Sequence, residues 1–355
     1  MVACAPLLPY RPADPLSLNV PLSQAGVQDQ RAAFAVLFEQ ELAASGAEAT
    51  IDAWLHGARA EVATAKPLVE RLDRQFAARR ATTVVLIVPG LFGDCVADQS
   101  VPFGDGKLRP PEEQVSAAYE QYRDLGLRRI RMVPLPGRAT SLRNGERLAE
   151  AIRAEAAQPG VEHIVLVGYS KGVPDTLHAL EALVRSGGLP PQVAALVSVG
   201  GAVMGTPLAD RFEDLYGAVS PRVAPLQCSA AEGDELASIT RRERLRWMAD
   251  HPLPPALSYY SIVAYAAADE TAPLLHASHA LLSRVDPRND GQVAVSDAVL
   301  PSSTLLAAAR ADHWDVALPR DRHPSAWVHG FASGRHYPRE ALFRATLRWV
   351  VGSLR

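Results

Sequence analysis

The sequence predicts an α/β fold, in which a mostly parallel, doubly wound sheet is flanked by helices. Short, unbroken aliphatic runs such as Val84–Val88 and Ile164–Val167 are typical of strands that are buried on both faces. Segments with apolar residues at helical spacing separate these runs, and strands that alternate with helices indicate a parallel sheet. We therefore expect one large α/β domain over residues 81–355.

The chain before residue 81 has a different character. Residues 1–22 are rich in proline, which predicts an extended tether without a fold of its own. Residues 23–80 carry apolar side chains at helical spacing, and we expect helices at about 24–44, 51–60 and 67–78. This part is predicted to be an N-terminal helical extension that packs on, or shields, the α/β domain.

Within the α/β domain the predicted elements follow in order. Strands are expected at Val84–Val88, Arg129–Val133, Ile164–Val167, Val193–Val199 and Tyr259–Tyr265, with shorter strand-like runs at Gln292–Val295 and Ser303–Ala308. Helices are expected at Glu112–Asp124, Asn144–Ala157, from Pro174 through Leu183, and at Leu274–Val285 and Arg339–Leu354. Two further helical patterns, at 208–216 and 236–249, predict a helical, lid-like insertion over residues 208–257. The irregular loop at 94–111 is a second candidate for a lid over the active site.

Composition restricts the class of protein. Hydrophobic residues make up 48 % and charged residues 21 % of the chain, as in ordinary globular proteins with a large core. The net charge is −3, and acidic and basic residues are interspersed. The sequence has no basic stripe, so we do not expect it to bind nucleic acid. No apolar run is long enough to span a membrane. The sequence contains no metal-binding motif, and we expect no metal and no cofactor.

The positions of the three cysteines suggest two possible cellular compartments for the protein. Cys4 lies in Val-Ala-Cys, directly before the proline-rich tether, and this resembles the lipidated cysteine of a bacterial lipoprotein, although no signal peptide precedes it. On that interpretation Cys4 would carry a lipid anchor, the protein would be periplasmic or membrane-anchored, and Cys95 and Cys228 would be free to pair in an oxidising compartment. The alternative is a cytoplasmic protein with buried free thiols.

The most informative stretch is Gly168-Tyr169-Ser170-Lys171-Gly172. It follows an aliphatic run without a linker and opens a helical pattern, and strand, Gly-x-Ser-x-Gly, helix is the context of a nucleophile elbow. The serine of such an elbow sits on a strained turn, and glycines are needed where a Cβ would clash with neighbouring chain. We therefore predict that Ser170 is a nucleophile; the alternative is a coincidental tight turn.

A serine hydroxyl needs a base within hydrogen-bond reach and a group that orients the base. His313 directly follows a predicted strand, so we expect it to be the base rather than a structural histidine. Asp290, in an Asn-Asp-Gly turn, is the favoured acid because a tight turn can aim its carboxylate at the imidazole. Asp269, just after the strand at 259–265, is the competing acid.

Two backbone donors are needed where the oxyanion develops. One is expected to be the N–H of Lys171, and the other that of Leu91 or Phe92, with Leu91 favoured, in the loop after the first buried strand. The Lys171 side chain is expected to be solvated. Tyr169 and Trp314 are expected to line an apolar pocket for the acyl or alcohol group of a substrate, although either could serve packing alone.

Several blocks together carry a family resemblance. They are Val-Pro-Gly-Leu-Phe-Gly (88–93), Asn-Gly-Glu-Arg-Leu (144–148), Gly-Tyr-Ser-Lys-Gly (168–172), Ser-Val-Gly-Gly-Ala-Val-Met-Gly-Thr-Pro-Leu-Ala-Asp (198–210), Asn-Asp-Gly-Gln-Val (289–293) and Asp-His-Trp-Asp (312–315). In this order they resemble the bacterial lipases and esterases of the α/β-hydrolase superfamily, over residues 82–318. The resemblance implies the α/β-hydrolase fold and a triad of Ser170, Asp290 and His313. Unlike the family's usual elbow, Gly-His-Ser-x-Gly-Gly, this chain has Tyr169 and Val173.

These interpretations together predict a serine-dependent carboxylic ester hydrolase that works through an acyl-enzyme on a small-molecule or lipid-like ester. The same machinery would suit a thioesterase, an amidase or an acyltransferase. A non-catalytic binding protein that kept the fold is the alternative from a different class.

Overall fold

The computed structural model describes residues 26–46, 50–57, 62–93, 101–107, 109–212, 234–322 and 331–354. Outside these residues lie the predicted tether with Cys4, the other two cysteines, and residues 213–233 of the predicted insertion. In the described part of the chain, no helix is both long and apolar enough to cross a bilayer.

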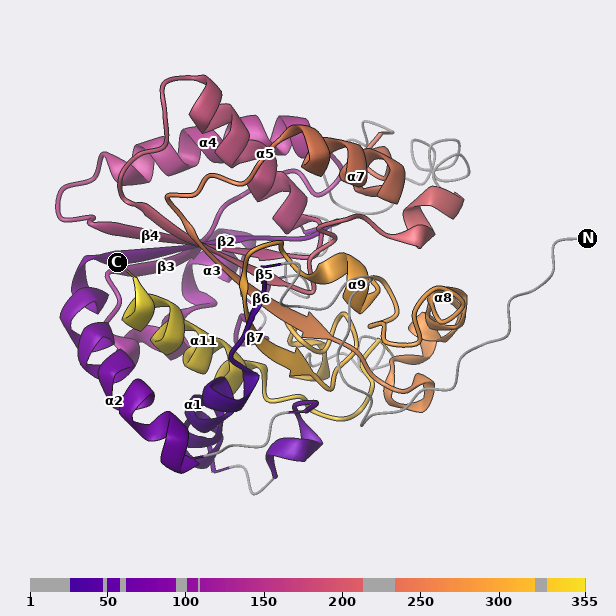
Figure 1. The fold of residues 1–355 in the computed structure, drawn as a ribbon, viewed down its shortest axis with the longest axis horizontal. Coiled ribbons are helices and arrows are strands. Elements are labelled where there is room, and N and C mark those ends of the chain that lie inside the picture. The colour runs from indigo at the N-terminus through magenta and orange to yellow at the C-terminus, as the bar shows by residue number, and fades with distance from the viewer. Residues whose placement is uncertain are drawn as a thin grey trace, which may run out of the picture.

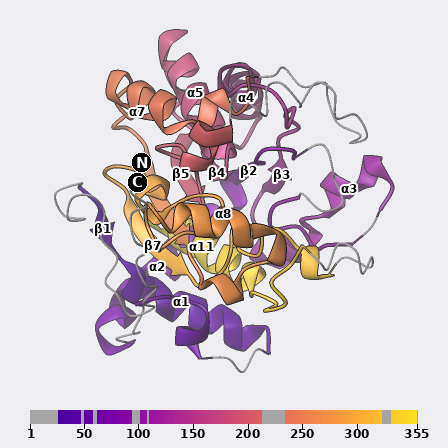
Figure 2. The same ribbon diagram turned by 90° about the vertical axis from the view of Figure 1, so that its right-hand side faces the viewer.

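One parallel sheet forms the centre of the molecule (Figure 1). Within the described residues it has seven strands, β1 (Gln28–Asp29), β2 (Thr83–Val88), β3 (Arg129–Met132), β4 (His163–Tyr169), β5 (Val193–Val199), β6 (Ser258–Ala264) and β7 (Thr304–Ala309). Their order is β1-β7-β6-β5-β4-β2-β3, and all the neighbouring pairs are parallel. Figure 2 shows the strands side by side from β1 to β3. The predicted fold class is therefore confirmed.

The aliphatic runs form strands because both faces of the sheet are covered. Alternate residues of β2 point to opposite sides, so Val84 and Leu86 enter one core whereas Val85 and Ile87 enter the other. The first core contains α4 (Ser141–Ala156) and α5 (Gly172–Arg185), while the second contains α1 (Arg31–Ala44), α2 (Val62–Arg79) and α11 (Arg339–Ser353). Figure 1 shows these two helical layers on either side of the strands.

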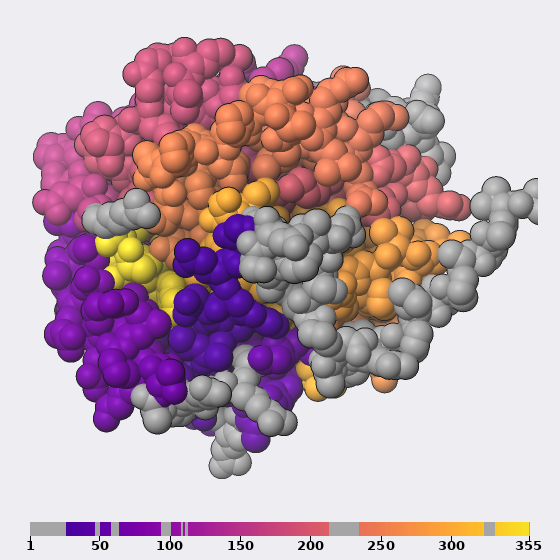
Figure 3. All heavy atoms as spheres, viewed as in Figure 1, coloured from indigo at the N-terminus to yellow at the C-terminus, as the bar shows by residue number. Residues whose placement is uncertain are grey.

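The N-terminal segment is part of the second layer. Phe34, Phe38 and Leu72 from α1 and α2 share one core with Phe343 of α11 and with the sheet. In Figure 3 the indigo and purple surface of this segment adjoins the yellow surface of α11. The remaining helices are α3 (Pro111–Ala117), α7 (Arg241–Asp250), α8 (His276–Leu282) and α9 (Val295–Ala298).

Several predicted elements have other boundaries. The first helix begins at Arg31 rather than near residue 24, because the residues before it pair with the open edge of β7 through Gln28 N–H to Ser303 O (2.9 Å). The helix expected at 51–60 is a short 3₁₀ turn, Ile51–Ala53, followed by a bridge between Leu55 and Ala309. The helix expected at 112–124 is divided into α3 and a 3₁₀ segment.

The strand predicted at Gln292–Val295 is wrong. Asp290 Oδ1 accepts the backbone N–H groups of Gln292 (2.8 Å) and Val293 (2.7 Å), so these donors serve a turn rather than a strand ladder. The chain then enters the short helix α9 at Val295. Alternating polar and apolar residues alone cannot distinguish such a turn from an edge strand.

The Lys171 side chain is not solvated as predicted. It is 1 % exposed, and its Nζ donates to Asp175 Oδ1 at 2.7 Å, one turn along α5. Asn144 of α4 donates its Nδ2 to the other oxygen of Asp175, also at 2.7 Å. The carboxylate of Asp175 therefore links Lys171, at the start of α5, to Asn144 of α4.

The close contact between α4 and α5 generates a prediction for Gly145. A Cβ at this position would lie 2.6 Å from the Cβ of His178 in α5, so the two helices would have to move apart. We expect Gly145→Ala to lower the free energy of unfolding by about 1–3 kcal/mol, although alanine favours helix by about 1 kcal/mol. Urea denaturation measures this, with Glu150→Ala on the exposed face of α4 as the control. An unchanged or raised stability of Gly145→Ala would contradict the contact.

A second prediction concerns the buried ion pair. Asp175→Ala leaves the ammonium of Lys171 buried without its carboxylate, and we expect a loss of about 3–5 kcal/mol in the free energy of unfolding. The same helix carries a matched control pair, Glu181 and Arg185, with an N–O distance of 3.6 Å and 22 % and 61 % side-chain exposure. Glu181→Ala should cost no more than about 1 kcal/mol. Equal losses in the two variants would refute the special contribution of the buried pair.

Candidate active site

Ser170 lies in the turn between β4 and α5, at the carboxyl edge of the sheet. Its φ is 55°, in the left-handed region that a residue with a side chain rarely adopts. A Cβ on Gly172 would lie 2.3 Å from the carbonyl oxygen of Val88, and one on Gly168 would lie 2.9 Å from Val173 Cγ2. The two glycines of the motif therefore allow the turn to pass close to its neighbours.

His313 and Asp290 lie beside this serine. The Nε2 of His313 is 2.8 Å from Ser170 Oγ, and its Nδ1 is 2.7 Å from Asp290 Oδ2. Because a carboxylate accepts only, Nδ1 carries the hydrogen toward Asp290, and Nε2 can accept from the serine hydroxyl. The structure thus brings together all three residues that the sequence analysis selected from separate parts of the chain.

Further hydrogen bonds hold the imidazole and the carboxylate in place. The backbone N–H of His313 donates to the carbonyl oxygen of Asp290 at 2.8 Å. Tyr169 donates its hydroxyl to the carbonyl oxygen of His313 at 2.7 Å, and burial raises the pKa of Tyr169 well above its usual value, so the donor proton is retained. The competing acid, Asp269, is exposed in a 3₁₀ turn after β6.

The loop after β2 passes directly over the serine. A Cβ on Gly90 would lie 2.9 Å from the Cβ of Ser170, so only glycine fits this approach. The N–H of Phe92 donates to the carbonyl oxygen of Gly137 at 3.0 Å. Among the backbone hydrogen bonds of the described residues, the N–H groups of Leu91 and Lys171 have no acceptor.

Two cavities open at Ser170, and we name them by their linings. The arginine cavity, about 260 Å³, is lined among others by Tyr169, His313, Trp314 and Arg320. The apolar cavity, about 270 Å³, is lined by Ala209, Phe212, Leu236, Ile239 and Val293, together with other residues. Leu91, Ser170 and Gln292 line both. Leu236 and Ile239, like Phe212, come from the predicted insertion at 208–257.

The sequence analysis did not select two of these lining residues. Gln292 lies in the run that was expected to be a strand, and its position follows from the turn at Asp290. Arg320 belongs to no motif or periodic pattern, and only its place seven positions after His313 hints at a shared site. Within the described residues, no three side chains of His, Cys, Asp or Glu group as metal ligands would.

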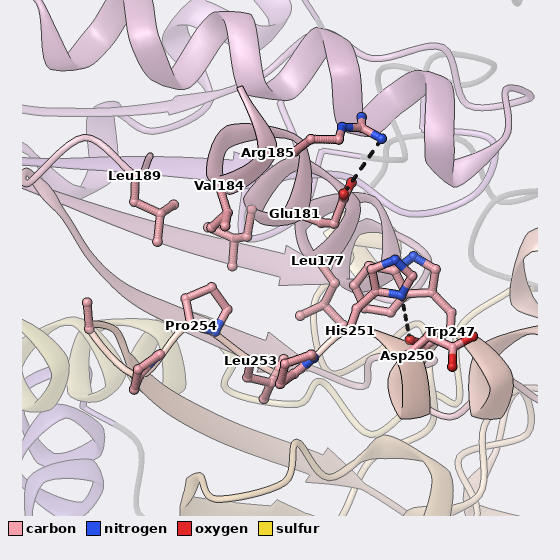
Figure 4. Close-up of a pocket in the computed structure, with 14 residues that line it drawn as sticks. Leu177, Glu181, Val184, Arg185, Leu189, Trp247, Asp250, His251, Leu253 and Pro254 are labelled. Atoms are coloured by element: carbon pink, nitrogen blue, oxygen red, sulfur yellow. Dashed lines mark hydrogen bonds and ion pairs between the residues drawn. The ribbon is translucent and has the colours of Figure 1, made fainter. Parts of the chain in front are cut away.

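A larger cavity, about 580 Å³, lies away from this serine (Figure 4). It is formed between α5, through Leu177 and Val184, and the segment around Trp247, Leu253 and Pro254. Its lining includes none of Ser170, Asp290 and His313, so size alone does not identify the site of chemistry here.

Comparisons with known proteins bear on the fold and the family. No family model and no curated protein sequence matches the chain. Among solved structures, the metagenomic carboxyl esterase MGS0156 is 33 % identical over 96 % of this chain and 96 % of that one, with a TM-score of 0.77. The mature lipase BlEst2 of Bacillus licheniformis is 19 % identical over 66 % and 86 %, with a TM-score of 0.47. EstA from Clostridium botulinum is 11 % identical over 78 % and 88 %, with a TM-score of 0.48.

The first of these similarities determines the family, since it combines substantial identity with nearly complete coverage of both chains. It also agrees with the resemblance carried by the sequence blocks and with the seven-stranded parallel sheet. The chain therefore belongs to the α/β-hydrolase superfamily, among its carboxyl esterases.

Proposed function

We propose that this protein is a serine-dependent carboxylic ester hydrolase that works through an acyl-enzyme. The observation that carries the proposal is the continuous hydrogen-bond chain from Asp290 through His313 to Ser170 Oγ, at the point where two cavities meet. The carboxyl esterase with 33 % identity supports an ester as the substrate.

In the proposed mechanism Ser170 Oγ attacks the ester carbonyl while His313 Nε2 takes its proton. Asp290 stabilises the imidazolium that forms, and its own carboxylate is held by the N–H groups of Gln292 and Val293. His313 then gives the proton to the leaving alcohol, and water, activated by the same imidazole, hydrolyses the acyl-enzyme.

The tetrahedral oxyanion needs two donors that other groups do not occupy. We assign this role to the N–H groups of Leu91 and Lys171, because that of Phe92 is engaged by Gly137. The start of α5 lies next to Lys171, and the dipole of the helix favours negative charge at this end. The oxyanion would thus be stabilised without any reorganisation of the turn.

Ser170→Ala tests the nucleophile. With p-nitrophenyl esters of graded chain length, we expect kcat/KM to fall by at least about 1000-fold, because the covalent route is lost. A fluorophosphonate probe should label the wild type at Ser170 and leave this variant unlabelled. Ser186→Ala, near the far end of the same helix, is the matched control and should retain full activity. Unchanged activity of Ser170→Ala, without labelling of the wild type, would refute Ser170 as the nucleophile, and no hydrolysis by the wild type would favour a non-catalytic protein.

The acid is tested by two matched substitutions. Asp290→Asn removes the charge that orients the imidazole, and we expect kcat to fall by about 1000- to 10 000-fold with the fold retained. Asp269→Asn changes an exposed side chain and should leave kcat unchanged. A large loss in Asp269→Asn alone would transfer the role to that residue. Thioester and anilide substrates, assayed in parallel, separate ester hydrolysis from the related reactions.

A further inference from the structure

Arg320 places a positive charge next to the proposed nucleophile. Arg320 lines the arginine cavity together with Ser170 and His313. The guanidinium carbon lies 4.3 Å from the centre of the Trp314 ring and 5.7 Å from that of Phe331, so two aromatic rings hold it. The side chain is therefore fixed at the wall of the cavity rather than extended into solvent.

This guanidinium has no acceptor among the described residues. Its Nε and Nη1 are buried and make no hydrogen bond. Two carboxylates lie within electrostatic range, but Asp312 accepts the N–H groups of Ala272 and Trp314, and Asp315 accepts the hydroxyl of Ser333. A buried cation without a hydrogen-bonded partner is costly. Nη2 is not among these enclosed nitrogens, so an anion in the cavity could contact it and offset part of this cost.

The charge also limits the kind of anion. Burial lowers the pKa of Arg320, yet a guanidinium remains protonated near neutral pH. It offers a single positive charge, and burial raises the pKa of both nearby carboxyls, that of Asp312 to about 8, which disfavours their charged forms. A monoanionic carboxylate matches this one cation, whereas a phosphate dianion would bring a second negative charge into the cavity without a partner.

The position of His313 shows which part of an ester would enter this cavity. The leaving oxygen must receive its proton from Nε2, so the alcohol portion has to lie on the side of the imidazole. His313 lines the arginine cavity, whereas the described lining of the apolar cavity does not include it. The apolar cavity then receives the acyl portion.

We propose that Arg320 binds a carboxylate on the alcohol portion of the substrate, so that the enzyme prefers esters of hydroxy acids. This inference rests on the proposed function, because it needs Ser170 and His313 in their assigned roles. Arg320 then acts as the residue that determines specificity on the leaving-group side, while the apolar cavity selects the acyl chain.

A matched pair of substrates tests the proposal. In 3-(butanoyloxy)benzoate the leaving group carries a carboxylate, and in 3-(butanoyloxy)benzamide a neutral amide of similar shape replaces it. The ratio of their kcat/KM values does not depend on the fraction of active enzyme. We expect Arg320→Met to lower this ratio by about 10- to 100-fold, as for the loss of a charge-assisted hydrogen bond. Arg320→Lys should give an intermediate ratio. Arg185→Met, an exposed arginine at the distant cavity, should leave it unchanged.

Inhibition of the wild type gives a test that needs no variant. Against p-nitrophenyl butanoate, 3-hydroxybenzoate should inhibit about 10-fold more strongly than 3-hydroxybenzamide. Equal inhibition, or an equal substrate ratio in wild type and Arg320→Met, would overturn the proposal. So would an Arg320-dependent preference for mono-p-nitrophenyl succinate over p-nitrophenyl butanoate, since that carboxylate is on the acyl side.

Hydrolysis of p-nitrophenyl butanoate separates this inference from the proposed function. If Ser170-dependent hydrolysis persists while the Arg320 tests fail, only the inference about Arg320 is wrong. If that hydrolysis is absent, the proposed function itself is wrong.

Discussion

The turn that holds Ser170 at a φ of 55° is the constraint around which the rest of the site is arranged. Such a conformation costs of the order of 1–3 kcal/mol and persists only when the surroundings determine it. Here β4 fixes the chain on one side and α5 on the other, while the loop with Gly90 covers the serine closely. The buried pair of Lys171 and Asp175 then anchors the first turn of the helix to α4. The hydroxyl is thus held rigidly at the carboxyl edge of the sheet.

The parallel sheet explains why residues from distant parts of the chain meet at this hydroxyl. The carboxyl ends of parallel strands lie along one edge, so the loops that follow β2, β4 and β7 converge there. One loop supplies Leu91, the next Ser170 and the third His313. Asp290 comes from the segment between β6 and β7, and its turn points the carboxylate toward the imidazole. The topology therefore creates an asymmetric site, with the imidazole on one side of the serine and apolar side chains on the other.

Features with a local cause were predictable from the sequence. The strands were recognisable because burial on both faces requires unbroken aliphatic runs, as in Val193–Val199, and the elbow because close backbone approaches require glycine. The Asn-Gly pair at 144–145 contributed only to the family resemblance in the sequence. In the structure Asn144 donates a hydrogen bond to Asp175, and the absence of a Cβ on Gly145 leaves room for His178. Ser170, Asp290 and His313 could be selected because each has a local signal, namely the elbow motif, a tight Asn-Asp-Gly turn and a strand directly before the histidine, and because the family resemblance implies the same three residues.

Features that depend on distant partners were not predictable. The burial of Lys171 depends on Asn144 and Asp175, which lie on two helices, and a lysine beside an active-site turn looks like a surface residue in the sequence. The strand at Gln28–Asp29 exists only because the edge of β7 is open to it. Arg320 has no local signal, since its surroundings are formed by Trp314 and Phe331 after the chain has folded.

The sharing of one core by α1, α2 and α11 has a consequence for biosynthesis. The first two helices are synthesised before the helix that covers them and before the strand that β1 joins. Until then Phe34, Phe38 and Leu72 lack their native neighbours, and contacts between such distant segments form slowly. The nascent chain therefore exposes aromatic and aliphatic surface until those later segments have been made, and such surface promotes aggregation.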